Sequence, residues 1–272
     1  IMFGMGLSLV KNDFIRLFQH PKAILVGLLN QIILLPIIAY VLISLFDVDT
    51  DIAIGIMMLA ACPGGPTSNL ITHLAKGDTG LSVSLTAANS LITIFTIPFV
   101  IDFALTQFLD ASEMIQIDKL KTVIQIFVIV IIPVSIGMAL KAAKPAFSDK
   151  MSKPVKIASG VVLFLVIIGL VLKKKADLIP YLQQAGLVAL ALNVTTMVIG
   201  FITAKTAKLN LSQSLTISIE SGIQNGTMAI AIASGILMNE NYAIAPAVYS
   251  LIMFFTGGAI IAYGMKSIKI NG

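Results

Sequence analysis

The sequence predicts an all-α membrane protein with eight complete spans plus a partial first span. Of its 272 residues, 57% are hydrophobic and only 11% are charged, a balance that soluble domains do not sustain over such a length. Apolar runs of about 20 residues, the length of a helix that crosses the hydrocarbon core, recur along the whole chain. Strands of a membrane barrel are about half as long and alternate in polarity, so helical spans are favoured.

The apolar runs divide the chain into spans that are joined by short polar or lysine-rich loops. A partial span, 1–10, comes first, and because the chain opens inside an apolar run we expect a trimmed N-terminus and a missing first span. We expect the complete spans at 22–46, 52–75, 81–108, 122–140, 157–172, 179–204, 211–238 and 243–265. Two of these spans carry polar and helix-breaking residues in the middle, and they are the most informative.

The first interruption is the stretch CPGGPTSN at 62–69. Pro63 and Pro66 lack the backbone N–H group that a helix uses to hydrogen-bond. Ser68 and Asn69 follow where a second half-helix would start, and both residue types are effective helix caps. The pattern predicts a broken helix, and a proline-kinked helix without a ligand is the alternative for this segment alone.

The second interruption surrounds Glu220, an acidic residue deep within the span 211–238. A carboxylate at membrane depth costs about 3 kcal/mol or more, so its default interpretation is functional. Gly222 and Gly226 weaken a helix, and polar neighbours can satisfy the backbone groups that a break sets free. Those neighbours are Ser218, Ser221, Gln224, Asn225 and Thr227. We predict a second broken helix with oxygen atoms aimed at a cation; the alternative is a polar patch that only joins two helices.

A polar stripe runs along the span 81–108. Its members, spaced by four, three, four and three residues, share one helix face: Ser82, Thr86, Asn89, Thr93 and Thr96. We expect ligand or near-ligand roles for Ser82 and Thr86. For Thr93 and Thr96, packing between helices is an adequate explanation.

The candidate ligand atoms are hydroxyls, amides, freed carbonyls and one carboxylate. Asn30 and Gln31 add two amides in the middle of the span 22–46. This hard, weakly charged set suits sodium better than calcium or a transition metal. Cys62 is the single cysteine, which excludes an internal disulfide, and His20 and His73 are isolated. No metalloprotease motif and no nucleophile–base pair is recognisable, so an enzyme is not expected.

The basic residues orient the chain. If the spans alternate, the eighteen Lys and Arg residues divide thirteen against five. The richer side is expected to face the cytoplasm, which places the C-terminus there. It holds Lys11, Arg16, Lys22, Lys76, Lys141, Lys144, Lys150, Lys153, Lys156, Lys205, Lys208, Lys266 and Lys269. The other side holds Lys119, Lys121, Lys173, Lys174 and Lys175. The net charge of +5 is therefore explained by topology, and no nucleic-acid partner is expected.

A weak internal repeat relates the two halves of the chain. GLSLVKNDF at 6–14 is similar to GLVLKKKADL at 169–178, and the two copies leave the membrane on opposite sides. The repeat is therefore inverted. Interrupted spans at matching positions of inverted halves indicate the binding site of a secondary transporter.

The sequence resembles the bile-acid:sodium symporter (BASS) family over essentially the whole chain, and it is most similar to the family's bacterial members. The matching motifs are MFGMGLSL (2–9), CPGGPTSNLIT (62–72), GLSVSLT (80–86) and ESGIQNG (220–226). The resemblance implies a panel domain, formed by 1–20 and 115–178, and a core domain, formed by 21–114 and 179–272. The two discontinuous helices would cross in the core. Bacterial members usually have ten spans, so this chain would lack the first and half of the second.

The resemblance also implies the roles of individual residues. One sodium site would use Ser68, Asn69, Ser82, Thr86 and Glu220. The other would use Gln31, Glu220, Gln224 and the carbonyls of Ser221 and Ile223. Pro66, Thr67 and Asn225 would face the substrate. Many members have Thr directly after CPGG, whereas this chain has Pro66, so one substrate-facing hydroxyl is replaced.

The expected function is a sodium-coupled symporter that imports an organic anion by alternating access. The anion is expected to be bile-acid-like or a small carboxylate such as pantothenate. Two Na⁺ ions, one Glu220 carboxylate and a monoanion sum to zero charge, which avoids an unpaired charge at membrane depth. We expect a monomer in the inner (plasma) membrane. The alternatives are a proton-coupled organic anion transporter and a non-transporting membrane sensor or channel.

Overall fold

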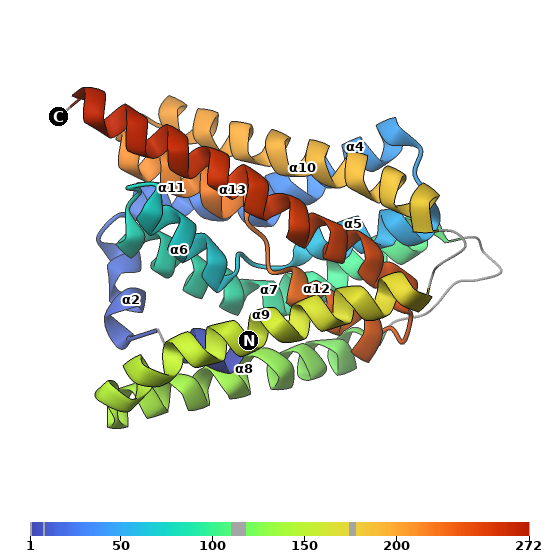
Figure 1. The fold of residues 1–272 in the computed structure, drawn as a ribbon, viewed down its shortest axis with the longest axis horizontal. Helices are drawn as coiled ribbons and strands as arrows, with labels where there is room; N and C mark the ends of the chain where they lie inside the picture. The colour runs from blue at the N-terminus through green and yellow to red at the C-terminus, as the bar shows by residue number, and fades with distance from the viewer. Residues whose placement is uncertain (1, 8, 110–117, 174–177, 272) are drawn as a thin grey trace.

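The structure is a computed structural model that describes residues 2–7, 9–109, 118–173 and 178–271, where every regular element is a helix (Figure 1). The first half contains α1 (Met2–Gly6), α2 (Lys11–Ile15), the 3₁₀-helix η1 (Arg16–Phe18), α3 (Pro21–Leu29), the π-helix η2 (Asn30–Leu34), α4 (Leu35–Phe46), α5 (Thr50–Ala61), α6 (Pro66–Leu74) and α7 (Thr79–Phe108). The second half contains α8 (Lys119–Ala143), α9 (Pro145–Lys173), α10 (Leu178–Thr206), α11 (Leu211–Gly222), α12 (Gly226–Gly235), the 3₁₀-helix η3 (Glu240–Ala243) and α13 (Ile244–Asn271). The all-helical prediction is confirmed for this part of the chain.

Five helical segments of the described chain are long and apolar enough to cross a membrane. They are Pro21–Phe46, Thr79–Phe108, Leu120–Ala143, Gln183–Thr206 and Glu240–Ser267. The two interrupted spans each form a pair of half-helices, α5 with α6 and α11 with α12, and none of these halves exceeds 12 residues. A half-helix of that length cannot cross the hydrocarbon core alone. The count of eight complete spans stays a prediction.

Short polar side chains start many of these helices. Asp49, Asp78, Asp118, Asn210 and Asn225 each accept a hydrogen bond from a backbone N–H in the first turn that follows. Such a cap satisfies one of the donors that a helix N-terminus leaves without an intrahelical partner. These caps fix where each helix begins, so the loops end at the polar capping residues.

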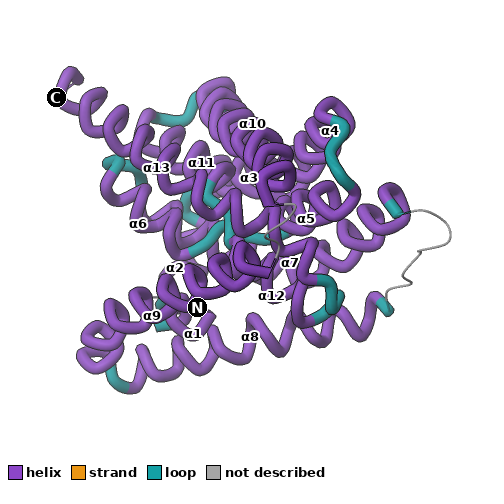
Figure 2. The backbone as a smooth tube through the Cα atoms, turned by 45° about the vertical axis from the view of Figure 1, so that its right-hand side comes forward, coloured by secondary structure: helices purple, strands orange, loops and turns teal. Residues whose placement is uncertain are grey.

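The helices form two groups. α8 and α9 run side by side along one edge in Figures 1 and 2, with α1 against α8. The contact between α1 and α8 is close: a Cβ atom on Gly137 would lie 2.5 Å from the Phe3 carbonyl oxygen and 2.8 Å from Gly6 Cα. Glycine permits this approach because it has no side chain. The remaining long helices and the four half-helices make up the larger group.

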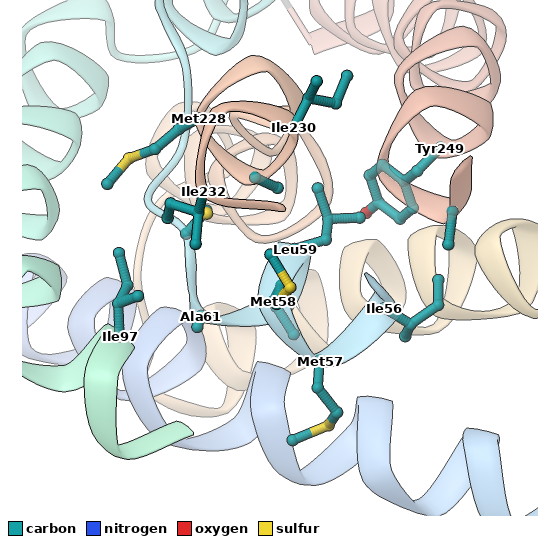
Figure 3. Packing of buried hydrophobic residues seen from close by; sticks show 14 of the residues in the cluster. Ile56, Met57, Met58, Leu59, Ala61, Ile97, Met228, Ile230, Ile232 and Tyr249 are labelled. Carbon is teal, nitrogen blue, oxygen red and sulfur yellow. The ribbon is translucent and has the colours of Figure 1, made fainter. Parts of the chain in front are cut away.

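The core of the larger group surrounds α5. Every residue from Ile52 to Ala61 is buried, as expected for a helix that is apolar on all sides. Figure 3 shows Met58 and Leu59 of α5 among Ile230 and Ile232 of α12, with Tyr249 of α13 nearby. Because α5 is enclosed, the point at which it ends is held firmly, and that point is the first break.

Candidate functional site

The two breaks lie against one another. α5 ends at Ala61 and α6 begins at Pro66, while α11 ends at Gly222 and α12 begins at Gly226. Gly64 pairs with Gln224 in an isolated antiparallel bridge, and the Asn225 backbone N–H donates to the Pro63 carbonyl oxygen across 3.0 Å. The predicted broken helices therefore meet, and the backbone itself joins them.

Local sequence explains how each break forms. Cys62 and Gly65 have extended backbone conformations, and Pro66 occupies the first turn of α6, where its missing N–H group costs nothing. Gly64 is required by space, since a Cβ atom there would lie 2.9 Å from Glu220 Oε2. On the other chain segment, Ile223 is extended and Asn225 caps α12 by accepting from the Met228 N–H.

Glu220 is the centre of a buried hydroxyl cluster. Its side chain accepts hydrogen bonds at Oε1 from Ser68 Oγ (2.6 Å) and Ser82 Oγ (2.6 Å), and at Oε2 from Thr86 Oγ1 (2.9 Å). These hydroxyls come from α6 and α7, whereas Glu220 is on α11. All four residues are at most 2% exposed. Two consecutive helices of the first half, α6 and α7, thus converge on one carboxylate from the second half.

Asn69 completes this cluster, which contains all five residues predicted for the first sodium site. Its Oδ1 atom lies 2.8 Å from Ser82 Oγ and 3.3 Å from Thr86 Oγ1. Ser68 Oγ also lies 2.8 Å from the Gly65 carbonyl oxygen.

The cluster has too few protons for its contacts. Five oxygen–oxygen contacts of 2.9 Å or less involve the hydroxyls of Ser68, Ser82 and Thr86. Three hydroxyls supply three protons, because each hydroxyl donates once. Two of the five contacts therefore lack a hydroxyl proton; the Asn69 amide can supply one donor through Nδ2 if it is turned, and one contact still brings oxygen lone pairs together beside an ionised Glu220. A cation among these oxygens would remove that conflict, and the set of ligand atoms suits a hard ion of low charge.

A second buried cluster joins Gln31 to Gln224. Gln31 Nε2 donates to Gln224 Oε1 (2.8 Å) and to the Cys62 carbonyl oxygen (2.7 Å). Gln224 Nε2 donates in return to Gln31 Oε1 (3.2 Å), to the Ser221 carbonyl oxygen (2.9 Å) and to that of Glu220 (3.3 Å). The residues predicted for the second sodium site thus lie together, with the Ile223 carbonyl oxygen near Gly64 at the crossing. Glu220 takes part through its backbone carbonyl here and through its carboxylate in the first cluster.

The π-helix η2 directs Gln31 to the crossing, and sequence analysis missed it. Asn30 Nδ2 donates to Thr203 Oγ1 on α10 (2.8 Å) and to the Val26 carbonyl oxygen (2.8 Å), so Asn30 points away from the crossing. Gln31, the next residue, points to it. Single π-turns inside α-helices occur frequently at functional sites. The sequence signal for this π-helix was the pair of adjacent amides, Asn30 and Gln31, within an apolar span. Two neighbouring amides in lipid each need a hydrogen-bond partner on a different side of the helix.

The predicted substrate residues lie at the starts of α6 and α12. Pro66 and Thr67 are partly exposed, whereas Asn225 is 3% exposed. Asn225 Oδ1 accepts from Thr227 Oγ1 (2.8 Å) and from the Met228 N–H (3.1 Å). Its Nδ2 group is buried and has no hydrogen-bond partner among the described residues. Asn225 thus holds an unused donor next to the crossing.

The polar stripe of α7 divides into two parts. Ser82 and Thr86 reach Glu220, whereas the Thr93 hydroxyl donates to the Asn89 carbonyl oxygen of its own helix (2.7 Å). Thr96 is only half-buried. Two further polar residues, Asn193 on α10 and Tyr249 on α13, are fully buried at the end of α11 and were not singled out from the sequence.

Comparison with known proteins identifies the family. The family model described as "Sodium Bile acid symporter family" matches residues 1–182. The "Uncharacterized sodium-dependent transporter YocS" of Bacillus subtilis (strain 168) is 28% identical over 273 residues, which cover 99% of this chain and 82% of that protein. The human "Ileal sodium/bile acid cotransporter" is 25% identical over 277 residues, covering 100% of this chain and 78% of that protein.

A plant relative extends the range of named transporters. The "Probable sodium/metabolite cotransporter BASS2, chloroplastic" of Oryza sativa subsp. japonica is 26% identical over 263 residues. That alignment covers 96% of this chain but 61% of the plant protein, so the chain spans less than two thirds of that relative. All three relatives are named as sodium-dependent transporters or sodium cotransporters, and the family is one of transporters and not of enzymes. The broken helices, the apolar spans and the family match lead to one conclusion: the chain is a multi-pass membrane protein of the sodium bile acid symporter family.

Proposed function

We propose that this protein is a symporter that couples the inward movement of two Na⁺ ions to the import of an organic anion. The observation that carries the proposal is the hydroxyl cluster at Glu220, where five short oxygen contacts share three protons. Such a cluster is poorly satisfied by hydrogen bonds alone. Membership of a family of sodium-dependent transporters supports sodium as the ion.

Each cluster is assigned one ion. The first Na⁺ binds among Ser68, Asn69, Ser82, Thr86 and the Glu220 carboxylate. The second binds among Gln31, Gln224 and the carbonyls of Glu220, Ser221 and Ile223. In the second cluster the Gln31 and Gln224 amides hydrogen-bond to each other, so they must separate or rotate before both side-chain oxygens can bind the ion.

The substrate is assigned to the start of α6 and α12, at Pro66, Thr67 and Asn225. Both half-helices begin at the crossing, and a helix N-terminus carries a partial positive charge that favours an anion. The unused Asn225 Nδ2 donor fits a carboxylate oxygen. Bile-acid-like anions and small carboxylates such as pantothenate are the candidate substrates.

The grouping of the helices supports alternating access between two domains. α1, α8 and α9 belong to the proposed panel domain, formed by 1–20 and 115–178, whereas both clusters lie in the proposed core domain, formed by 21–114 and 179–272. The boundary at 114–115 lies outside the described residues. We further propose a monomer in the inner membrane with a cytoplasmic C-terminus, as the distribution of basic residues favours.

The test is uptake of radiolabelled organic anions by proteoliposomes. Uptake should require an inward sodium gradient and should stop when potassium or choline replaces sodium. Glu220→Ala should abolish sodium-dependent uptake, because it removes the carboxylate on which the first cluster converges. The variant should still insert into the membrane at wild-type levels, so that a loss of uptake is not a loss of protein. Normal sodium-driven uptake by Glu220→Ala would refute the assignment. Uptake driven by a pH gradient without sodium would instead support proton coupling.

A further inference from the structure

The carbonyl oxygen of Gly222 is held by two buried side chains that the proposed sites leave unused. Tyr249, on α13, donates its hydroxyl proton to this oxygen across 2.7 Å, and Asn193, on α10, donates through Nδ2 across 2.7 Å. Asn193 Nδ2 also lies 3.2 Å from the Tyr249 hydroxyl oxygen. Both side chains are fully buried. This triangle ties the last residue of α11 to two neighbouring helices.

Gly222 lies between two residues, Ser221 and Ile223, whose carbonyl oxygens belong to the proposed second sodium site. A carbonyl at a helix C-terminus lacks its usual partner four residues later, and here the Gly226 N–H donates to the Gln224 carbonyl oxygen instead (3.1 Å). Two donors occupy the Gly222 oxygen, so it is directed to α10 and α13 and is not available to an ion.

Holding this carbonyl fixes the peptide plane between Gly222 and Ile223. The orientation of that plane restricts where the Ile223 carbonyl can point, because only the φ and ψ bonds of Ile223 separate the two groups. Gly222 is also confined by α10, since a Cβ atom there would overlap Met197 Cγ. The end of α11 is therefore held by α10 and α13 in addition to its last helical hydrogen bond, from the Ile223 N–H to the Ile219 carbonyl oxygen (2.8 Å).

Asn193 is poorly explained as a residue that serves stability alone. Its Oδ1 atom is buried and has no hydrogen-bond partner among the described residues. A buried acceptor without a partner destabilises the folded state. An apolar side chain of similar size would avoid this cost, so the amide is better explained by the bonds that its Nδ2 group makes at the break.

We propose that Asn193 and Tyr249 are positioning residues for the second sodium site. They hold the Gly222 peptide so that the carbonyls of Ser221 and Ile223 stay at bonding distance from the ion. Their role also includes ion selectivity, because oxygens at fixed positions match one cation radius better than another. This inference rests on the proposed function and concerns residues outside both assigned ligand sets.

The test measures sodium binding by the purified chain of residues 1–272 through its thermal stabilisation. NaCl is titrated against choline chloride at constant ionic strength, and LiCl is titrated in parallel. Tyr249→Phe keeps the ring and removes the hydrogen bond to the Gly222 carbonyl, together with the weaker one from Asn193 Nδ2. The sodium concentration for half-maximal stabilisation should therefore rise about five- to tenfold. The ratio of lithium to sodium affinity should also change, which a purely structural role would not produce.

Asn193→Leu gives a second, independent reading. It removes both donor bonds of Nδ2 and also the unpaired Oδ1 atom. Its melting temperature in choline should therefore equal or exceed that of the wild type, while its sodium affinity falls. Opposite directions for stability and sodium affinity are the signature of a positioning residue.

Tyr263→Phe is the matched control, because it makes the same change on α13 at a half-exposed ring that packs against Phe201. It should titrate like the wild type. The inference is overturned if the sodium and lithium responses of Tyr249→Phe equal those of the wild type. It is also overturned if Tyr249→Phe and Asn193→Leu both lose stability in choline and keep their sodium affinity. A wild-type protein that does not respond to sodium would overturn the proposed function as well.

Discussion

Among the individual residues, Glu220 is the group whose state differs between sodium coupling and proton coupling: it would hold a sodium ion in one case and a proton in the other. If its carboxyl group were protonated, the hydroxyl cluster would hold four protons for its five short contacts, and an Asn69 amide that presents Nδ2 to Ser82 would supply the fifth donor. A sodium ion can instead accept lone pairs from several oxygens at once. Either a bound proton or a sodium ion would therefore relieve the crowding of oxygens, and the sodium dependence of uptake separates the two.

The hydroxyl of Thr86 provides a direct test at this scale. Thr86→Val keeps the volume of the side chain and removes the oxygen that contacts Glu220 Oε2. We expect the sodium concentration for half-maximal stabilisation to rise about fivefold, consistent with about 1 kcal/mol for one lost interaction. A thermal-shift titration with sodium measures this change.

Thr96→Val is the matched control, since it makes the same substitution on the same helix at a half-buried position. It should leave the sodium titration almost unchanged. Equal effects of the two substitutions would mean that the stripe serves helix packing and not ion binding.

Among the elements, the half-helices depend on glycine where they meet their neighbours. Gly226, the first residue of α12, faces α13: a Cβ atom there would overlap Ser250 Oγ and would lie 3.1 Å from the Pro246 carbonyl oxygen. Gly235, at the other end of α12, has no atom within 4 Å of such a Cβ position. The two glycines therefore differ in packing although they belong to one short helix.

Gly226→Ala should destabilise the protein by about 1 to 3 kcal/mol, the usual cost of overpacking a tight contact. Gly235→Ala should be neutral or slightly stabilising, because alanine favours helix more than glycine does. Thermal unfolding in one detergent would compare the two. Adding Ser250→Ala to Gly226→Ala should recover part of the loss by removing the overlapping oxygen, and no recovery would show that the strain lies elsewhere.

At the scale of the whole molecule, the proposed stoichiometry has an electrical consequence. Two Na⁺ ions that enter with a monoanion carry one net positive charge inward, and moving one charge through 100 mV is worth about 2.3 kcal/mol. The anion and the ions also compensate each other's charge at one crossing, so each should strengthen the binding of the other by the same factor.

We therefore expect uptake of a monoanion to increase when the interior of the vesicle is made negative. Proteoliposomes at a fixed sodium gradient, with potassium and valinomycin setting the voltage, measure this response. The Hill coefficient for sodium should exceed one. A flat voltage response together with a Hill coefficient near one would replace the two-ion scheme with a single-ion symporter.

Much of the site could be predicted because its residues conflict with a lipid environment. Glu220 and the proline- and glycine-rich stretch at 62–69 are improbable in an apolar span, and the seven-residue repeat of polar positions on α7 indicates a shared face. The pairing of the two breaks was not predictable from local sequence, since the Gly64–Gln224 bridge joins segments from opposite halves. The π-helix at Asn30–Leu34 and the bonds of Asn193 and Tyr249 to Gly222 also depend on neighbouring helices that local sequence does not reveal.

The crossing also has a consequence for how the protein is made. The Ser68 hydroxyl meets the Glu220 carboxylate across a separation of 152 residues, so the N-terminal share of the site is synthesised and inserted well before its partner exists. Until α11 and α12 arrive, the polar face of α7 and the open backbone at 62–65 have no counterpart from the second half. During biogenesis this region must therefore rely on water, on the insertion machinery or on temporary partners within the first half. The hydroxyl cluster is therefore completed late in synthesis, and a chain that stalls before residue 220 leaves the hydroxyls of Ser68, Ser82 and Thr86 without the Glu220 carboxylate.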